Sequence, residues 1–259
     1  MGFKRLFGLG HPDGAIEVDT QILGPVRPGG DLRAVVLVKG GDRDAQIDEV
    51  ALRVDVRRTG HDGEEREHQV GTHYAEPSHF TLRKGEEQRL TVSQPLSWET
   101  PVSELGGRAL GVVLSVRTEL VLGGKRAGVD VDDDLLHVTA LPLHEAVLDA
   151  FADEGYLCDS AEVVEGDVPR TEQRVGIYQT LLLTGHAPGP GRPERLEVTF
   201  QPNAVGALVH VPRAAPHGRY WEDKPPARRF PAAHHEVGQV DWRPQVSKTL
   251  QELALLDDR

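Results

Sequence analysis

Residues 15–23 read AIEVDTQIL, and residues 50–57 read VALRVDVR. In both stretches, apolar or β-branched side chains alternate with mostly polar ones. A period of two places each set on its own face of an extended strand, so one face can be buried while the other stays in water. The two stretches therefore predict half-buried strands, and the second of them turns Ala51, Arg53, Asp55 and Arg57 toward the solvent.

Further strands are predicted before residue 140. Residues 110–120 alternate in the same way, with Ser115, Arg117 and Glu119 on the polar face. Residues 32–39 are apolar on both faces in their middle, which is typical of a central strand. Glycine and proline pairs such as Gly24-Pro25 and Gly123-Gly124 separate these runs as turns. Because no helical pattern lies between the strands, the sequence favours antiparallel sheets over βαβ units.

The pattern changes after residue 140. An apolar stripe at helical spacing predicts a helix that begins at Pro142 and ends before Gly155. Strands are predicted at 175–184, 196–200 and 207–211, and a terminal helix is predicted after Pro244, whereas residues 212–244 are predicted to be irregular. We therefore predict a mainly β protein of two tandem antiparallel β-sandwiches. The first covers residues 1–138, and the second covers residues 139–259 with one or two helices.

Composition and charge narrow the class of function. The 259 residues carry 29 basic and 41 acidic side chains, a formal net charge of −12. Such a surface repels polyphosphate and anionic lipid, which argues against a nucleic-acid partner. No apolar run is long enough to cross a bilayer, and the start MGFKRLFG lacks the apolar core of a secretory signal. We expect a cytoplasmic protein without stable membrane insertion.

No group of reactive residues has the spacing of a known catalytic or metal site. The run from Asp130 to Asp134 lacks the EF-hand spacing and is interpreted as a solvated hinge before a strand. His234 and His235 are adjacent, so on a strand they point to opposite sides and do not share an ion. The lone Cys158 precedes an acidic residue and is interpreted as a small packed side chain. We predict no enzymatic activity, no cofactor and no bound metal.

The N-terminus offers one candidate interaction site. Phe3, Leu6 and Phe7 lie at helical spacing around Lys4 and Arg5. These five residues predict a short basic amphipathic helix that touches a membrane surface or docks on a partner. The alternative is a tail that packs across its own sandwich or frays, because so short a helix is not stable alone.

Several turn and strand motifs resemble those of a known family, the bacterial sporulation-control M family. They are Ile16-Glu17-Val18-Asp19-Thr20, Val26-Arg27-Pro28-Gly29-Gly30, Val36-Leu37-Val38-Lys39-Gly40-Gly41, Leu96-Ser97-Trp98-Glu99-Thr100-Pro101 and Glu197-Val198-Thr199-Phe200. The resemblance is tight over the first 140 residues and loose thereafter. It implies an arrestin-like pair of β-sandwiches and a cytoplasmic regulator of sporulation or related development, without known chemistry.

These observations predict a non-catalytic adaptor that binds other proteins through sheet edges, loops or the groove between the sandwiches. Two alternatives stay open. One is a small-ligand or metal-binding module that uses a histidine-lined cleft, and the other is a peripheral membrane scaffold that docks through its N-terminus. Self-association into a homo-oligomer is compatible with open sheet edges.

Overall fold

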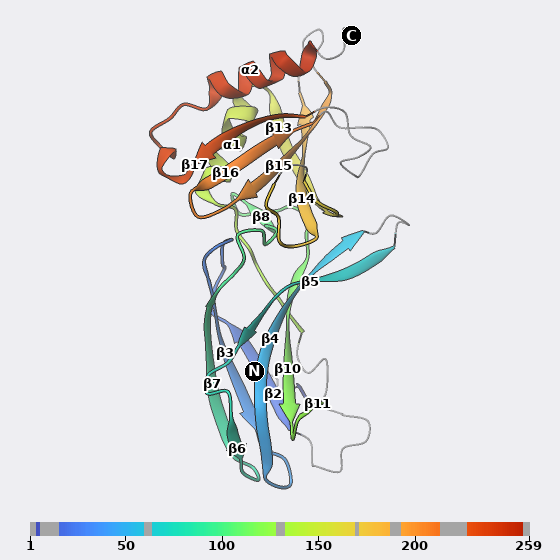
Figure 1. Ribbon diagram of the computed structural model, residues 1–259, viewed down its shortest axis with the longest axis vertical. Coiled ribbons are helices and arrows are strands. Elements are labelled where there is room, and N and C mark those ends of the chain that lie inside the picture. Colours follow the sequence, from blue (N-terminus) through green and yellow to red (C-terminus); the bar gives the residue numbers. More distant parts are fainter. Residues whose placement is uncertain are drawn as a thin grey trace.

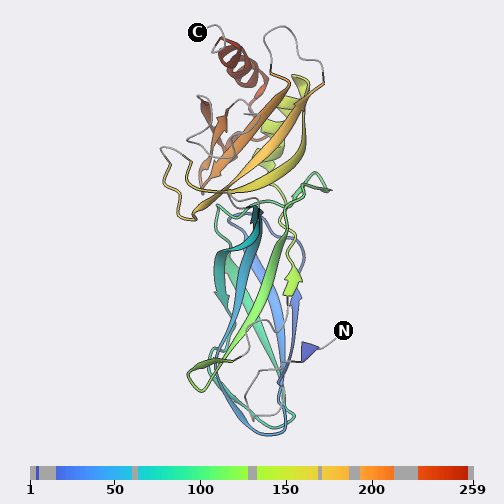
Figure 2. The same cartoon turned by 90° about the vertical axis from the view of Figure 1, so that its right-hand side faces the viewer.

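The structure, a computed structural model, describes residues 4–5, 16–59, 64–127, 133–168, 171–186, 193–212 and 227–255. Two β-rich halves follow one another along the long axis of the molecule, and both α-helices lie in the C-terminal half (Figures 1 and 2). All pairs of neighbouring strands are antiparallel. The predicted mainly β architecture with antiparallel sheets in tandem is confirmed.

Two sheets form the N-terminal half. The first sheet has the order β1-β2-β3-β7 and the second has the order β11-β10-β4-β5, with β12 added to β10 and β6 added to β4. The strands of the first sheet are β1 (Lys4–Arg5), β2 (Glu17–Ile22), β3 (Asp31–Lys39) and β7 (Glu87–Pro95). Those of the second are β4 (Ala45–Thr59), β5 (Glu65–Tyr74), β6 (Phe80–Leu82), β10 (Leu114–Leu122), β11 (Lys125–Ala127) and β12 (Asp133–Leu135). A small hairpin of β8 (Glu104–Leu105) and β9 (Arg108–Ala109) lies apart from both sheets.

The inward faces of these sheets carry the predicted apolar residues. Val18 in β2 and the alternate valines and leucine of β4 from Val50 to Val56 are fully buried. Thr20 of the first sheet meets Thr118 of the second, and their hydroxyl oxygens share a hydrogen bond of 2.6 Å. The two polar side chains satisfy each other inside the sandwich, so neither is left unpaired in an apolar environment.

The C-terminal half contains one antiparallel sheet of five strands in sequence order. They are β13 (Tyr156–Glu165), β14 (Ile177–Gly185), β15 (Arg195–Pro202), β16 (Gly206–Val211) and β17 (Arg228–Ala233). β15 pairs with β14 through residues 195–198 and with β16 through residues 199–202, so it joins the two parts of the sheet. Two helices, α1 (Pro142–Asp153) and α2 (Arg243–Ala254), pack on this sheet and on each other.

Both helices were predicted. The residues at the two ends of α1 explain where this helix begins and where it ends. Pro142 opens α1, where its missing N–H would have no intrahelical partner in any case. Gly155 follows the helix with a φ of +87°, the left-handed conformation that ends many helices. Buried side chains from α1 and α2 join those of all the larger sheets in one continuous apolar core, which runs from Ile16 to Leu253.

Four predicted features of the fold are wrong in detail. The strand predicted from Leu110 begins at Leu114, because Gly111 has a φ of +84° and interrupts the extended chain. The strand predicted from residue 175 begins at Ile177. The segment 212–244 was predicted to be irregular but contains β17 and a short 3₁₀ helix, η2 (His234–Glu236). The solvated hinge predicted at Asp130–Asp134 includes strand β12, which pairs with β10.

Candidate functional site

The ends of β4 and β5 form a two-stranded ribbon that projects from the N-terminal half. We call residues 55–59 and 65–69 the β4–β5 ribbon; at its base Asp55 and Val56 still pair with β10, and beyond them the ribbon is two-stranded. The register places Val54 opposite Gly71 but Asp55 opposite Gln69, so Val70 is an extra residue on β5. Such a bulge bends a strand and increases its twist. In Figure 1 the ribbon leaves the sandwich at the level of the junction between the two halves.

The outer part of the ribbon carries charged side chains on both faces. Arg57, Glu65 and Arg66 are each about half exposed or more. Their ion pairs are long: Arg57 lies 3.8 Å from Glu65, and Arg66 lies 3.6 Å from Glu64. Exposed pairs of this kind contribute little to stability. These three side chains therefore bury little surface against their own chain.

The C-terminal half holds one side chain of the ribbon, that of Arg58, which lies opposite Arg66. Nη1 of Arg58 lies 2.8 Å from Oε2 of Glu165 at the end of β13, and the Arg58 side chain is only 9% exposed. A charge-assisted hydrogen bond to a largely buried guanidinium is among the stronger polar contacts in proteins. This contact fixes the direction of the ribbon relative to the sheet of the C-terminal half.

A compact charged cluster lies on one sheet face at the base of the ribbon. Asp55 is 1% exposed, although the alternation of the strand predicts a wet face at this position, so the prediction is wrong there. Arg53 donates from Nε to the Asp55 carboxylate over 2.8 Å, and Arg117 reaches both Asp55 and Glu67. Long arginine side chains lie across the sheet and cover the carboxylate. Ala51 and Glu119, also predicted to face solvent, are buried as well.

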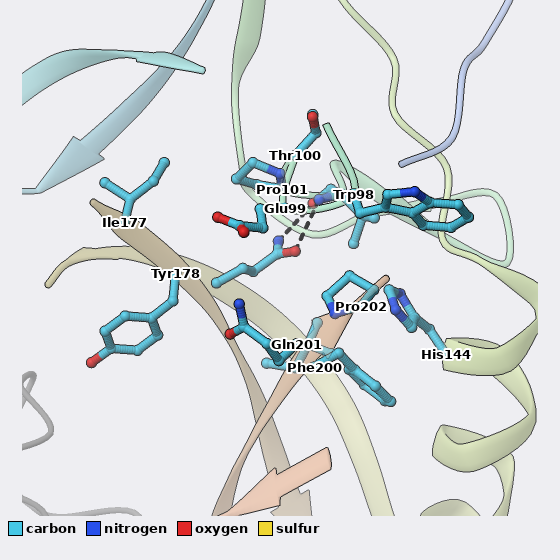
Figure 3. A pocket seen from close by; sticks show the side chains of 13 residues that line it. Trp98, Glu99, Thr100, Pro101, His144, Ile177, Tyr178, Phe200, Gln201 and Pro202 are labelled. Carbon is cyan, nitrogen blue, oxygen red and sulfur yellow. Dashed lines mark hydrogen bonds between the residues drawn. The ribbon is translucent and has the colours of Figure 1, made fainter. Parts of the chain in front are cut away.

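Main-chain groups and two polar side chains join the two halves. The Glu99 carboxylate accepts hydrogen bonds from the main-chain N–H groups of Arg174 and Val175, at 2.9 Å and 2.8 Å. The Gln179 amide bonds both main-chain groups of Val102, at 2.7 Å and 2.9 Å (dashed lines in Figure 3). These contacts attach the turn 98–102 to the start of β14. The junction between the two halves is therefore held by direct hydrogen bonds.

A small hollow lies beneath this turn. Trp98, His144, Phe200 and Pro202 are among the residues that line it, and His144 points from α1 toward Pro202 and Trp98 (Figure 3). Its volume of about 30 Å³ accommodates one or two water molecules. The sequence left open a small-ligand module that uses a histidine-lined cleft. This hollow is lined by His144, and its volume is too small for a metabolite.

His144 is the unusual residue of the hollow. Its ring stacks on Phe200 with centroids 4.3 Å apart, and neither of its ring nitrogens has a hydrogen-bond partner within the described part of the chain. Burial, together with a smaller effect of the nearby His234, lowers the pKa of His144 to about 3. The imidazole is therefore neutral at physiological pH and acts as a packed aromatic ring.

The lone cysteine behaves as predicted from the sequence. Cys158 is buried in β13, and burial raises its thiol pKa to about 11. The carboxylate of Asp159 also raises this pKa, whereas Arg108 lowers it. A thiol with so high a pKa is a poor nucleophile at neutral pH.

The structure only partly covers the predicted N-terminal interaction site. Lys4 and Arg5 form strand β1, which pairs with β2, so the predicted helix is wrong at these two positions. Phe3, Leu6 and Phe7 lie outside the described residues. In the parts of the chain that the structure describes, no helix has the length and apolar character that a bilayer span requires.

The other residues considered for metal binding do not come together. Asp133 and Asp134 belong to β12, and Asp130 and Asp132 lie outside the described residues. His234 and His235 lie in η2 and not in a strand as supposed. Nε2 of His234 lies 2.8 Å from the Asn203 carbonyl, and its ring stacks on Trp98. Over the described ranges, no three His, Cys, Asp or Glu side chains are grouped as metal ligands.

Sequence reasoning missed the residues that build the junction and the residues that hold the ribbon against the C-terminal half. Glu99 stands in the motif Trp98-Glu99-Thr100-Pro101, which was interpreted only as a turn. Gln179 is a polar residue two positions before the leucine run 181–183 of β14, and this position was the available signal. Nothing in the neighbourhood of Arg58 indicates that Glu165 is its partner, because 107 residues separate them.

Comparisons with solved structures agree with the fold. The crystal structure of Spo0M, a sporulation control protein from Bacillus subtilis, matches with a TM-score of 0.75 and 22% identity, covering 93% of this chain and 99% of that chain. The ApaA protein described as putative from Bordetella pertussis matches with a TM-score of 0.26 and 16% identity, covering 48% of this chain and 91% of that chain, and no argument rests on it. The predicted arrestin-like fold is thereby confirmed.

Comparison with protein families gives the classification. None of the curated proteins compared matches this chain. The family model described as SpoOM protein matches residues 3–211, which is most of the sequence. The match includes the motifs of the first half, the turn 98–102 and strands β13 to β16. The chain therefore belongs to the Spo0M family, as its sequence motifs predicted.

Proposed function

We propose that this protein is a non-catalytic adaptor, acting in the cytoplasm in sporulation or a related developmental programme by binding other proteins. The developmental role follows from its family and from the printed name of the Bacillus subtilis protein, a sporulation control protein. Fold and family alone do not identify a binding activity, so the adaptor role needs support from this chain's own surface.

The observation that carries the proposal is the β4–β5 ribbon. It extends past the sandwich, is held by the Arg58–Glu165 contact, and exposes charged side chains on both faces. Arg57, Glu65 and Arg66 bury little surface in their own chain, so these positions add little to its stability. Such an element is well placed to be buried by a partner instead.

The interior of the molecule favours the same class of function. The hollow at the junction accommodates one or two water molecules, whereas small-molecule sites typically measure about 300–1,000 Å³. His144, His210 and Cys158 are buried residues with strongly shifted pKa values, and all three are held in their neutral forms. These features support binding at the surface and offer no activated nucleophile or base.

Proximity labelling in the native host tests the proposal. A labelling enzyme fused to the full chain is compared with a variant in which residues 59–65 are replaced by Asn-Gly. Arg58 and Arg66 lie opposite each other, so a two-residue turn can join them and the Arg58–Glu165 contact is kept. Exchanging the exposed turn residue Val205 for threonine serves as the matched surface control.

We expect a small set of proteins to be labelled by the full chain and by the control, and to be lost with the shortened ribbon. The same labelled proteins with and without the ribbon would contradict the role given to the ribbon. Turnover of a metabolite by the purified protein, abolished by substitution within the chain, would contradict the non-catalytic assignment.

A further inference from the structure

The outer edge of β5 differs between its two ends. Toward its C-terminal end the edge is occupied. The Gln94 side chain bonds both main-chain groups of Tyr74, at 3.1 Å and 3.2 Å, and Glu76 exchanges main-chain hydrogen bonds with Thr91 of β7. Along residues 65–69, no strand within the described residues pairs with this edge. An unpaired edge presents alternate N–H and C=O groups that another strand can use.

The side chains along this open edge form a charge pattern. Glu65 and Glu67 share one face of β5, and Arg66 and His68 share the other. Glu65 is 70% and Arg66 is 48% exposed, and each takes part in an ion pair within its own chain. Glu67 is 43% exposed and is bonded to Arg117 on the inner side of the ribbon. The edge therefore presents two carboxylates with a guanidinium between them.

A second copy of the same edge does not match this pattern. In an antiparallel pair, two residues that lie directly opposite each other form either a hydrogen-bonded or a non-hydrogen-bonded pair. Their main-chain N–H and C=O groups therefore either both point toward the partner strand or both point away from it. In a symmetric pairing of two β5 edges, opposed residue numbers therefore have the same parity. Centring the pair on residue 66 sets Arg66 against Arg66 and Glu65 against Glu67. Centring it on residue 67 sets Glu67 against Glu67 and Arg66 against His68. Both of these registers oppose like charges, which destabilises strand pairing. A pair centred on residue 68 opposes no like charges, but it extends into the bulge at Val70.

We infer that the open edge of the ribbon binds an extended segment of a partner protein by strand addition. The segment has Lys or Arg opposite Glu65 and Glu67, and Asp or Glu opposite Arg66. This inference rests on the proposed function and gives the partner its chemistry. Main-chain hydrogen bonds supply the attachment, and the alternating charges choose the sequence and the register. The charges that disfavour pairing with a second β5 edge are the same charges that favour binding of this segment.

Two synthetic peptides test the inference on the full chain. The matching peptide is acetyl-Val-Lys-Glu-Lys-Val-Thr-amide, and the charge-swapped peptide is acetyl-Val-Glu-Lys-Glu-Val-Thr-amide. Each is titrated into nitrogen-15-labelled protein, and amide chemical shifts and hydrogen exchange are measured. We expect the matching peptide to shift and protect amides of residues 65–70, and to bind about tenfold more tightly than the swapped peptide.

Charge reversal supplies the matched variants. Glu65→Lys combined with Glu67→Lys is expected to invert the preference between the two peptides. Glu87→Lys combined with Glu172→Lys changes the net charge equally at exposed positions elsewhere, and is expected to keep the original preference. Far-ultraviolet circular dichroism checks that both double variants retain their sheets.

Equal binding of the two peptides, shifts centred outside residues 65–70, or no shifts at millimolar peptide would overturn the strand-addition inference. The proposed function is judged separately by proximity labelling. Labelling that still depends on the ribbon while the peptides fail would overturn only the strand-addition chemistry. Labelling of the same proteins with and without the ribbon would overturn the binding role proposed for the ribbon.

Discussion

The side-chain amide of Gln179 bonds both main-chain groups of Val102. Its Nε2 donates to the Val102 carbonyl over 2.7 Å, and its Oε1 accepts from the Val102 N–H over 2.9 Å. Val102 is 3% exposed, so these main-chain groups have little access to water. A side chain from β14 thus takes the place of a neighbouring strand for one residue of the N-terminal half.

Replacing this side chain should loosen the junction. Gln179→Ala leaves a buried N–H and a buried carbonyl without partners, which costs about 2 kcal/mol of the free energy of unfolding. Urea unfolding followed by circular dichroism measures the loss, and hydrogen exchange of the Val102 amide should become faster. Gln239→Ala, at an exposed position, is the control. A Gln179→Ala protein as stable as this control would show that the pair does not hold the junction.

Gly29 is required by its backbone and by its neighbour. Its φ is +72°, and a Cβ added there would overlap the indole ring of Trp98. Gly24 has a φ of +85° with nothing within 4 Å of an added Cβ, so it isolates the backbone effect. We expect Gly24→Ala to cost about 1 kcal/mol and Gly29→Ala about 3 kcal/mol of unfolding free energy. Urea midpoints of the two variants provide the comparison, and equal losses would mean that the ring moves aside freely.

Strands that bury one continuous face could be predicted from the sequence. β2, β3 and β4 have uninterrupted inward-facing positions, so the period of two is visible without the structure. β13 was missed because a bulge between Cys158 and Ser160 shifts the alternation halfway along the strand. β5 was missed because its ribbon part is polar on both faces and carries no apolar period. In each case the missing signal reflects a place where the strand leaves regular sheet geometry.

The candidate site was less predictable than the fold. Glu99, Gln179 and Arg58 act through partners that are 75 or more residues distant in the sequence. Local pattern reasoning sees such a residue only as a polar position in a turn or a strand. Asp55 shows the same limit, because its burial depends on arginines from β4 and β10 lying across it. Periodicity reports the face of a strand and does not report which side chains cover that face.

Cys158 should react slowly with thiol reagents in the folded protein. Burial raises its pKa to about 11, so the thiolate fraction at pH 8 is roughly one in a thousand. We expect the rate with Ellman's reagent to rise at least about tenfold when the chain is unfolded in urea. Asp159→Asn should change the folded rate little, because burial is the larger cause of the shift. A fast reaction in the folded state would indicate that β13 opens readily at this position.

His144 links stability to pH. Its pKa in the folded state is about 3, against 6.5 as the ordinary value, so the unfolded chain binds a proton that the folded chain rejects. Between these two values the unfolded state gains stability as protons are added. The free energy of unfolding should therefore fall by about 1.4 kcal/mol for each pH unit below 6.5, and recover above it. His210 acts in the same direction, because burial lowers its pKa to about 4.

Replacing His144 by leucine should remove its contribution to the pH dependence of the free energy of unfolding and leave that of His210. His144→Leu keeps an apolar side chain of similar bulk against Phe200 and has no proton to bind. Urea unfolding measured at several pH values from 4 to 7 should give a pH dependence shallower by about 1.4 kcal/mol per pH unit than that of the unmodified chain. His79→Gln, at an exposed position, should leave the slope unchanged. If His144→Leu kept the full slope, the imidazole would not be buried in its neutral form, and the packing of the hollow beneath Trp98 would have to be revised.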